Sequence, residues 1–115
     1  MTSPTHTPGL QSFDLDQLDR LAEQAQPYHE FLRRRGMSLG IYVLPAGGTD
    51  HQHPHASDEV YVVLRGRGAL EVQGQEHEVR QGSVISVDHG EEHRFVNITE
   101  DLHVLVVFAP PDDPD

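Results

Sequence analysis

Residues 47–66 read GGTDHQHPHASDEVYVVLRG, and no other stretch of the chain is as informative. His51, His53 and His55 stand on alternate residues, and Glu59 follows four residues later at the start of a hydrophobic run. Alternate side chains of an extended chain point to the same face, about 6.5–7 Å apart. Imidazole nitrogens and a carboxylate oxygen suit first-row transition metals, whereas calcium and magnesium prefer oxygen ligands alone. The stretch therefore predicts part of a transition-metal site that needs further ligands from elsewhere.

Two glycine-framed patterns follow one another along the chain. The first pattern consists of Gly47, His53, His55, Glu59 and Gly66. The second pattern consists of Gly82, Gly90, His93 and Asn97. In this order and spacing, the pair resembles the two motifs of the cupin superfamily. The second pattern departs from the family at Asp88, where a proline is usual, but that position belongs to a loop and not to the ligands.

The resemblance implies an all-β fold, a small jelly-roll barrel (double-stranded β-helix) with a metal ion inside. Carried over to this sequence, the implied ligands are His53, His55, Glu59 and His93. Neutral imidazoles with one carboxylate leave a divalent ion with residual positive charge and open coordination positions. The expected cofactor is one divalent transition metal per chain: iron, manganese, nickel or zinc. Two alternatives stay open, a polar surface loop that binds metal adventitiously and a cupin barrel without metal.

Further residues are candidates for the pocket around this ion. Tyr61, Val63 and Phe95 follow the implied ligands at alternate positions, so their side chains should face the barrel interior. His51 has the parity of His53 and His55. It is open between a fifth ligand, a group that hydrogen-bonds a ligand, an acid/base residue and a solvent-exposed histidine.

The remaining polar residues of interest have simpler interpretations. His103 is left open between an inward and an outward orientation. Asn97 is expected to fix a turn through its side-chain amide. The histidines expected at the surface are His6, His29, His77 and His89.

Composition limits the class of protein. A chain of 115 residues suffices for one domain with a core and is too short for two. The absence of cysteine excludes disulfides and thiolate metal sites. A formal net charge of −11 disfavours nucleic acid and anionic lipid as partners, because both need a basic face. No apolar run is long enough to span a membrane and no secretory signal precedes the domain, so a cytoplasmic location is the default expectation.

The chain divides into a loose tail (1–11), a single cupin domain (12–109) and an acidic tail (110–115). A short helix is expected at about 14–25, capped by Ser12 or Asp14, because leucines recur at helical spacing. Turn residues then delimit seven or eight short strands. Their ranges are 28–34, 39–44, 59–65, 69–73, 77–80, 83–87, 93–98 and 102–109.

Two details of these strands are specific enough to test. Gly66 and Gly68 are interpreted as a tight turn between the third and fourth strands. The last strand, LHVLVVFA (102–109), is nearly all apolar and is expected to be buried on both faces. That strand and the leucine stripe of the helix need cover, which favours a homodimer.

The chain contains no Gly-x-Ser-x-Gly, phosphate-binding loop or dinucleotide fingerprint, so metal chemistry or metal-assisted binding remains. By resemblance, the leading interpretation is a metal-dependent, dioxygenase-type enzyme that acts on a small oxygen-rich substrate. One alternative is a redox-neutral isomerase or lyase that uses the ion as a Lewis acid. The other is a small-ligand binding module without turnover.

Overall fold

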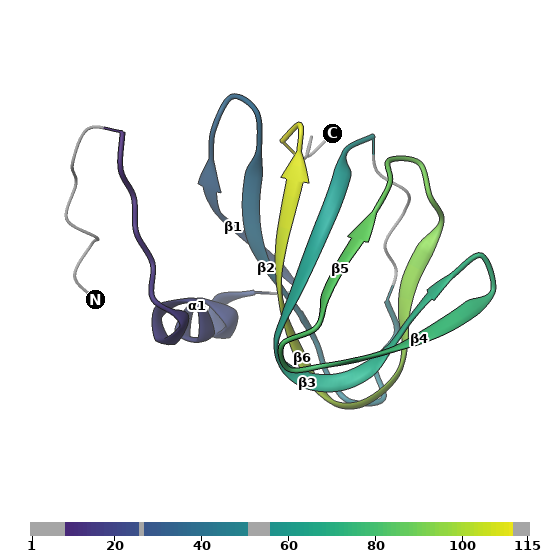
Figure 1. Ribbon diagram of the computed structural model, residues 1–115. Coiled ribbons are helices and arrows are strands. Elements are labelled where there is room, and N and C mark those ends of the chain that lie inside the picture. The colour runs from purple at the N-terminus through teal and green to yellow at the C-terminus, as the bar shows by residue number, and fades with distance from the viewer. Residues whose placement is uncertain (1–8, 26, 51–55, 112–115) are drawn as a thin grey trace.

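The computed structural model describes residues 9–25, 27–50 and 56–111. Its elements in chain order are α1 (Leu15–Leu21), the 3-10 turn η1 (Ala22–Gln24), β1 (Tyr28–Arg33), β2 (Ser38–Leu44), β3 (Asp58–Val72), β4 (Gln75–Arg80), β5 (Val84–Val87) and β6 (His93–Ala109). All strand pairs are antiparallel, in the order β1-β2-β6-β3-β4, and β5 pairs with β3 beside β4 (Figure 1). The fold is thus the all-β jelly roll with one short helix that the sequence predicts. Most of both predicted tails lies outside the described residues.

The two longest strands correct the predicted strand count. The segments 59–65 and 69–73 form one bent strand, β3, and the segments 93–98 and 102–109 form one bent strand, β6. The described residues therefore contain six strands, where the sequence predicts seven or eight.

The segments 59–65 and 69–73 form one strand because Gly66 bends β3 without reversing its direction. Its φ is +103°, a conformation that favours glycine, and a Cβ at this position would collide with the carbonyl oxygen of Asp101. Shifts of the β3–β6 register between Val63 and Ala69 accompany the bend. The close approach of β3 to β6 thus occurs where the sequence predicts a tight turn.

One core fills the interior between the curved strands. Its buried side chains are Tyr42, Leu44, Tyr61, Val63, Leu70, Val79, Val87, Phe95, Ile98, Leu102, Val104, Val106 and Phe108. In the segment 102–109 of β6, every second residue belongs to this set, while Leu105 on the other face is only half-buried. The expectation that 102–109 is buried on both faces is therefore wrong in degree, because the second face has only partial cover.

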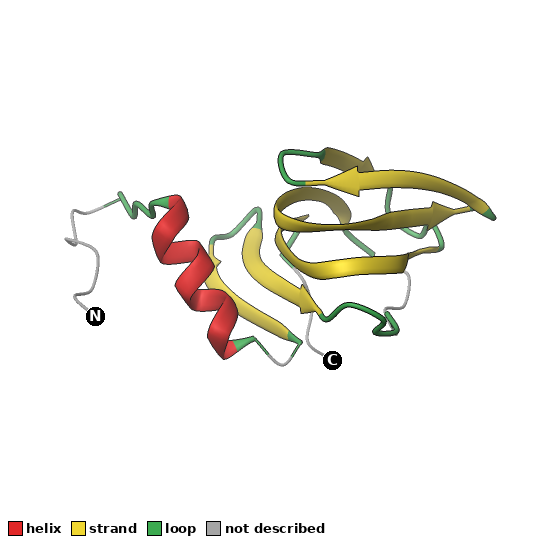
Figure 2. Ribbon diagram, turned by 90° about the horizontal axis from the view of Figure 1, so that it is seen from below, coloured by secondary structure: helices red, strands yellow, loops and turns green. Residues whose placement is uncertain are grey.

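The helix provides that partial cover from outside the barrel (Figure 2). Leu18, Leu21 and Ala22 pack on Ile41 of β2, with Leu105 at the edge of the cluster. Asp14 is the N-cap, and its backbone N–H donates to the Gln17 side chain at 2.8 Å.

Leu15 departs from the predicted leucine stripe of the helix. It is 70% exposed, whereas Leu18 and Leu21 of the same helix are buried in the cluster on Ile41. Within the described residues, neither helical segment has the length and apolar character needed to cross a bilayer.

Candidate metal centre

The bend in the β3–β6 ladder brings together residues from its opposite ends. Glu59 lies near the start of β3 and pairs with Phe108, whereas His93 opens β6 and pairs with Val72. Across the interior, the Glu59 Oε2 and His93 Nε2 atoms nevertheless lie 3.3 Å apart, and both side chains are 1% exposed. The two predicted ligands are therefore in contact inside the barrel.

Tyr61 completes this buried group. Its hydroxyl donates to Glu59 Oε1 at 2.8 Å and lies 2.8 Å from His93 Nε2. Its ring packs edge-on against Phe95, with the ring centroids 5.1 Å apart. The prediction that Tyr61, Val63 and Phe95 face the interior is confirmed.

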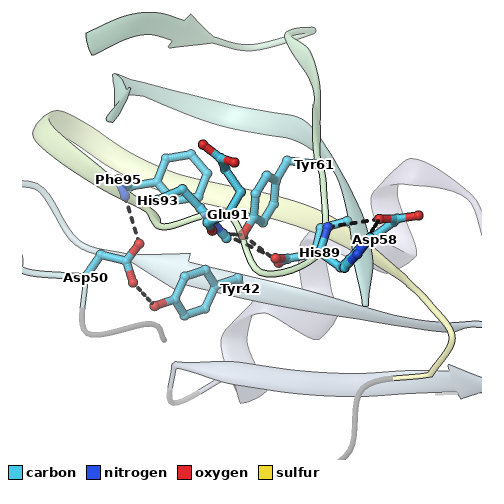
Figure 3. A network of polar contacts seen from close by, with 9 residues as sticks. Tyr42, Asp50, Asp58, Tyr61, His89, Glu91, His93 and Phe95 are labelled. Carbon is cyan, nitrogen blue, oxygen red and sulfur yellow. Dashed lines mark hydrogen bonds and ion pairs between the residues drawn. The ribbon is translucent and has the colours of Figure 1, made fainter. Parts of the chain in front are cut away.

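Hydrogen bonding orients the His93 ring. Its Nδ1 atom lies 2.7 Å from the Glu91 carbonyl oxygen, which only accepts, so Nδ1 carries a proton and donates (Figure 3). Burial acts to lower the pKa of His93, but the Glu59 carboxylate and the Glu91 carbonyl outweigh it, and the pKa lies above its ordinary value. In the metal-free protein, Nε2 therefore gains a proton readily and points it at Glu59 and Tyr61.

The donor atoms present fit a divalent transition metal. A buried carboxylate requires a cation or a proton donor beside it, because its charge is costly in a low-dielectric interior. An imidazole that donates from Nδ1 to a backbone carbonyl holds its Nε2 lone pair ready for a metal, the usual arrangement of ligating histidines. Glu59 and His93 meet both conditions.

The other predicted ligands, His53 and His55, lie outside the described residues, as does His51. In the described part of the chain, which omits residues 51–55, no group of three or more potential ligand side chains occurs. The structure thus brings together one predicted ligand from each of the two sequence patterns, Glu59 from the first and His93 from the second.

Asp50 is a buried polar residue near the candidate site that the sequence interpretation missed. It is 4% exposed, and its two carboxylate oxygens accept hydrogen bonds from the Tyr42 hydroxyl at 2.5 Å and the Phe95 backbone N–H at 2.8 Å (Figure 3). Burial and the neighbouring carboxylate raise the pKa of Tyr42 far above its ordinary value, which keeps the phenol protonated. The available signal was its position directly before His51, in a stretch that otherwise resembles a turn.

His103, His77 and His89 lie away from the interior. His103 contacts Asp19 of α1 at 3.0 Å, which settles its open orientation as outward. His89 pairs with Asp58 at the surface, and His77 is also exposed. His29 is half-buried, while His6 lies outside the described residues.

Asn97 lies within β6 at a φ of +50°, where its side-chain amide donates to Glu76 of β4. Asn97 is therefore not in a turn between strands, as expected, but adopts a left-handed backbone conformation within β6. Asn97 also lines a groove of about 570 Å³ between β3, β4 and β6. None of Glu59, Tyr61 and His93 lines this groove, so it is separate from the candidate metal centre.

Comparison with known families agrees with this architecture. The model of the cupin domain family matches residues 40–108, which include most of β2, all of β3, β4 and β5, and most of β6. The chain belongs to the cupin family. The matched residues include Glu59, Tyr61 and His93, so the buried group lies within the region that the family model covers.

Three similar proteins illustrate the range of this cupin's relatives. An uncharacterized protein of Streptomyces coelicolor is 50% identical over 106 residues, covering 90% of this chain and 99% of that protein. The dimethylsulfoniopropionate lyase DddW of Ruegeria pomeroyi is 33% identical over 75 residues, covering 65% of this chain and 49% of the lyase. An RmlC-like cupin of Methanocaldococcus jannaschii with a double-stranded β-helix fold superposes with a TM-score of 0.66 at 22% identity, covering 72% of this chain and 78% of that chain.

Proposed function

We propose that this cupin is an enzyme that binds one divalent transition metal through His53, His55, Glu59 and His93. The observation that carries the proposal is the buried contact between Glu59 and His93, 3.3 Å apart on strands that start at opposite ends of one ladder. A carboxylate and an imidazole that converge in a dry interior fit a metal ion such as iron, manganese, nickel or zinc. A small oxygen-rich molecule would be the substrate.

Each described residue has a definite task in this proposal. Glu59 supplies a negative charge, and His93 supplies a nitrogen lone pair whose direction is set by the Glu91 carbonyl. Phe95 and Val63 form dry walls, which strengthen electrostatic interactions inside the site. The bound ion would supply a Lewis acid and, if redox-active, electron exchange with dioxygen.

Tyr61 is the described residue best placed to touch a substrate. Its hydroxyl already contacts Glu59 and His93, so a molecule at the ion would lie within hydrogen-bonding reach of the phenol. A phenol in this place can donate to a substrate oxygen or transfer a proton.

The leading reaction type is a dioxygenation, which follows from the resemblance to cupins with three histidines and one glutamate. Such a reaction consumes dioxygen and needs a redox-active ion, which zinc is not. Oxygen uptake that depends on both the ion and a substrate supports this reaction.

A redox-neutral lyase reaction is the second candidate, and Tyr61 favours it. Elimination needs a group that accepts a proton next to a Lewis acid. The Tyr61 oxygen lies beside Glu59 and His93 and, as the phenolate, would accept that proton. The similarity to the lyase DddW points the same way, although this chain spans about half of that protein's length. Turnover of a carboxylate substrate without oxygen supports this alternative.

The test begins with metal content, measured by plasma mass spectrometry on protein purified without a histidine tag or chelator. About one equivalent of iron, manganese or nickel per chain supports the proposal and directs the substrate search to oxygen-dependent reactions. Zinc directs it to Lewis-acid chemistry. A protein that holds no metal, even after reconstitution, contradicts the proposal and favours the non-catalytic binding module.

The homodimer remains a prediction. Leu15 of α1 is exposed, and among the strands of the described residues β1 pairs with β2 alone. Both features are consistent with cover from a second copy. Light scattering after size-exclusion chromatography should give twice the chain mass, and a monomer at micromolar concentration contradicts the prediction.

A further inference from the structure

The groove between β3, β4 and β6 lies on the outer face of the sheet. Glu78 and Arg80 line it, and on β4 they flank Val79, which belongs to the core. Alternate side chains of a strand point to opposite faces, so Glu78 and Arg80 point away from the barrel interior. The groove volume of about 570 Å³ is within the range typical of small-molecule sites, about 300–1,000 Å³.

Two arginines face each other in this groove. Arg67 of β3 and Arg80 of β4 are directly opposite partners in the antiparallel ladder, and both line the groove. Opposite residues of such a ladder have Cβ atoms about 4.5–5.5 Å apart, and like charges there are destabilising. A carboxylate between the two guanidinium groups would offset this repulsion and accept charge-assisted hydrogen bonds from both.

The groups around the arginine pair leave hydrogen-bond donors for such a carboxylate. Arg67 directs its Nε at Glu100, 3.2 Å away, which engages only part of a guanidinium with five N–H groups. Within the residues that the structure describes, Arg80 makes no ion pair with a carboxylate. Ser83 also lines the groove, and its Oγ accepts the Arg80 backbone N–H at 2.9 Å, so its hydroxyl hydrogen can donate elsewhere.

The groove is acidic beyond the arginine pair. Glu78 and Glu76 follow at alternate positions of β4, about 6.5–7 Å apart along the strand, and both line the groove. The Asn97 side-chain amide donates to Glu76 at 2.5 Å and holds that carboxylate in place. Ala69 lies directly opposite Glu78, and its small side chain fills little of the space. Positive and negative groups therefore succeed one another along the groove.

We propose that this groove binds a small zwitterion, with its carboxylate between Arg67 and Arg80 and its ammonium group toward Glu78. A zwitterion has no net charge, so the acidic chain, with a formal net charge of −11, does not repel it as it repels a simple anion. A simple cation would instead meet the arginine pair. The site is independent of the candidate metal centre, whose described residues do not line the groove.

The test is a titration of the isotope-labelled full chain with γ-aminobutyrate, followed by NMR spectroscopy. This probe carries a carboxylate and an ammonium group at the ends of a short chain. Saturable shifts should appear at the backbone amides of Gly68, Ala69 and Ser83, which line the groove. The absence of saturable shifts, or shifts confined to Tyr61 and Phe95 at the metal centre, overturns the proposal.

Succinate is the matched ligand, because it has a similar length and a second carboxylate in place of the ammonium group. It should bind roughly tenfold or more weakly than γ-aminobutyrate, since its second carboxylate would face Glu78 instead of a cation that pairs with it. Succinate that binds as tightly as γ-aminobutyrate, or more tightly, overturns the proposal.

Arg80→Gln removes one guanidinium group from the site. γ-Aminobutyrate should then bind roughly tenfold or more weakly, the effect of losing a charge-assisted hydrogen bond. The free energy of unfolding should not fall, because Arg80 is exposed and opposes the like charge of Arg67. Wild-type affinity in this variant overturns the proposal.

Arg94→Gln is the matched control, because it changes the net charge equally. Arg94 faces Glu71 at 3.2 Å and does not line the groove. The affinity for γ-aminobutyrate should stay within about twofold of the wild type, since salt screens a remote charge. Equal weakening by Arg80→Gln and Arg94→Gln would show only a long-range charge effect and overturns the proposal.

Glu78→Gln tests the acidic part of the groove. It removes the charge that would face the ammonium group, so the preference for γ-aminobutyrate over succinate should shrink roughly tenfold. An unchanged preference overturns the proposal.

Discussion

The two sides of the candidate metal centre are held in place by different means. Glu59, Tyr61 and His93 lie on β3 and β6, where backbone pairing fixes the position of each side chain. Asp50 lies outside the strands and is fixed by hydrogen bonds of its own side chain. The position of Glu59, Tyr61 and His93, the strand-borne side, therefore depends on the shape of the β3–β6 ladder. The position of Asp50 depends on single polar contacts.

The largest predicted effect comes from the bend that creates the strand-borne side. Gly66→Ala places a Cβ against the Asp101 carbonyl at a φ that only glycine adopts easily. We expect a loss of roughly 2–4 kcal/mol in the free energy of unfolding, measured by urea denaturation. Metal binding should weaken as well, because Glu59 and His93 meet only through this bend.

Gly74→Ala is the control for that prediction. Gly74 also has a positive φ, +79°, but a Cβ there meets nothing within 4 Å. Its effect on the unfolding free energy should be clearly smaller, and metal affinity should not change. Equal losses in both variants would show that backbone strain alone matters and not the contact between β3 and β6.

Tyr61→Phe tests the chemistry of the strand-borne side without moving its strands. The ring still packs on Phe95, while the hydroxyl that contacts Glu59 and His93 is lost. The unfolding free energy should fall by about 1.5–3 kcal/mol, the usual contribution of a hydrogen bond to a charged group. Turnover, once a substrate is known, should fall by roughly 10²-fold or more. Unchanged turnover would exclude Tyr61 from proton transfer.

The pH dependence of the metal-free protein tests the interaction of Glu59 with His93. The folded-state pKa of His93 lies above the unfolded value of about 6.5. Its contribution to stability is therefore fully present below about pH 6.5 and is lost as the pH rises through the folded pKa. Urea denaturation between pH 5.5 and 9 should show this loss in the wild type and a weaker loss in Glu59→Gln. Identical pH profiles would contradict the interaction.

The smallest effect is expected at the surface pair beside the site. Asp58→Asn removes the charge that faces His89, although Asp58 is next to Glu59 in sequence. Exposed ion pairs contribute little, so stability at neutral pH and metal affinity should match the wild type. The pKa of Asp58 is lowered, chiefly by the His89 backbone N–H, so any contribution is present above about pH 4 and lost as the pH falls. A marked loss of metal binding would show that the Asp58 charge takes part in the site.

The strand-borne side could be predicted from the sequence because its residues recur at fixed spacing. The spacing of Glu59, Tyr61 and Val63 gives their common face directly. The continuity of β3 and β6 could not be recognised from the sequence, and each was predicted as two separate strands. A glycine such as Gly66 can mark a bend within a strand as readily as a turn between two strands. The orientation of the His103 side chain could not be predicted from the sequence, because apolar residues occupy both faces of its strand.

Asp50 could not be predicted for a physical reason. An aspartate near glycines is typical of a turn, and nothing in its neighbours shows that a tyrosine from β2 and a backbone N–H from β6 converge on it. Such contacts are set by tertiary structure alone. The position of Asp50, which lies outside the strands, is therefore the part of the candidate site that is hardest to predict from the sequence.

The measurement that tests the central claim most directly compares the metal content of the wild type with that of Glu59→Gln. Glu59→Gln keeps the size of the side chain and removes the charge that faces His93. The account predicts about one transition-metal ion per chain in the wild type and a small fraction of that in the variant, with circular dichroism unchanged. A wild type without metal after reconstitution, or a folded variant that retains a full equivalent, would contradict the account.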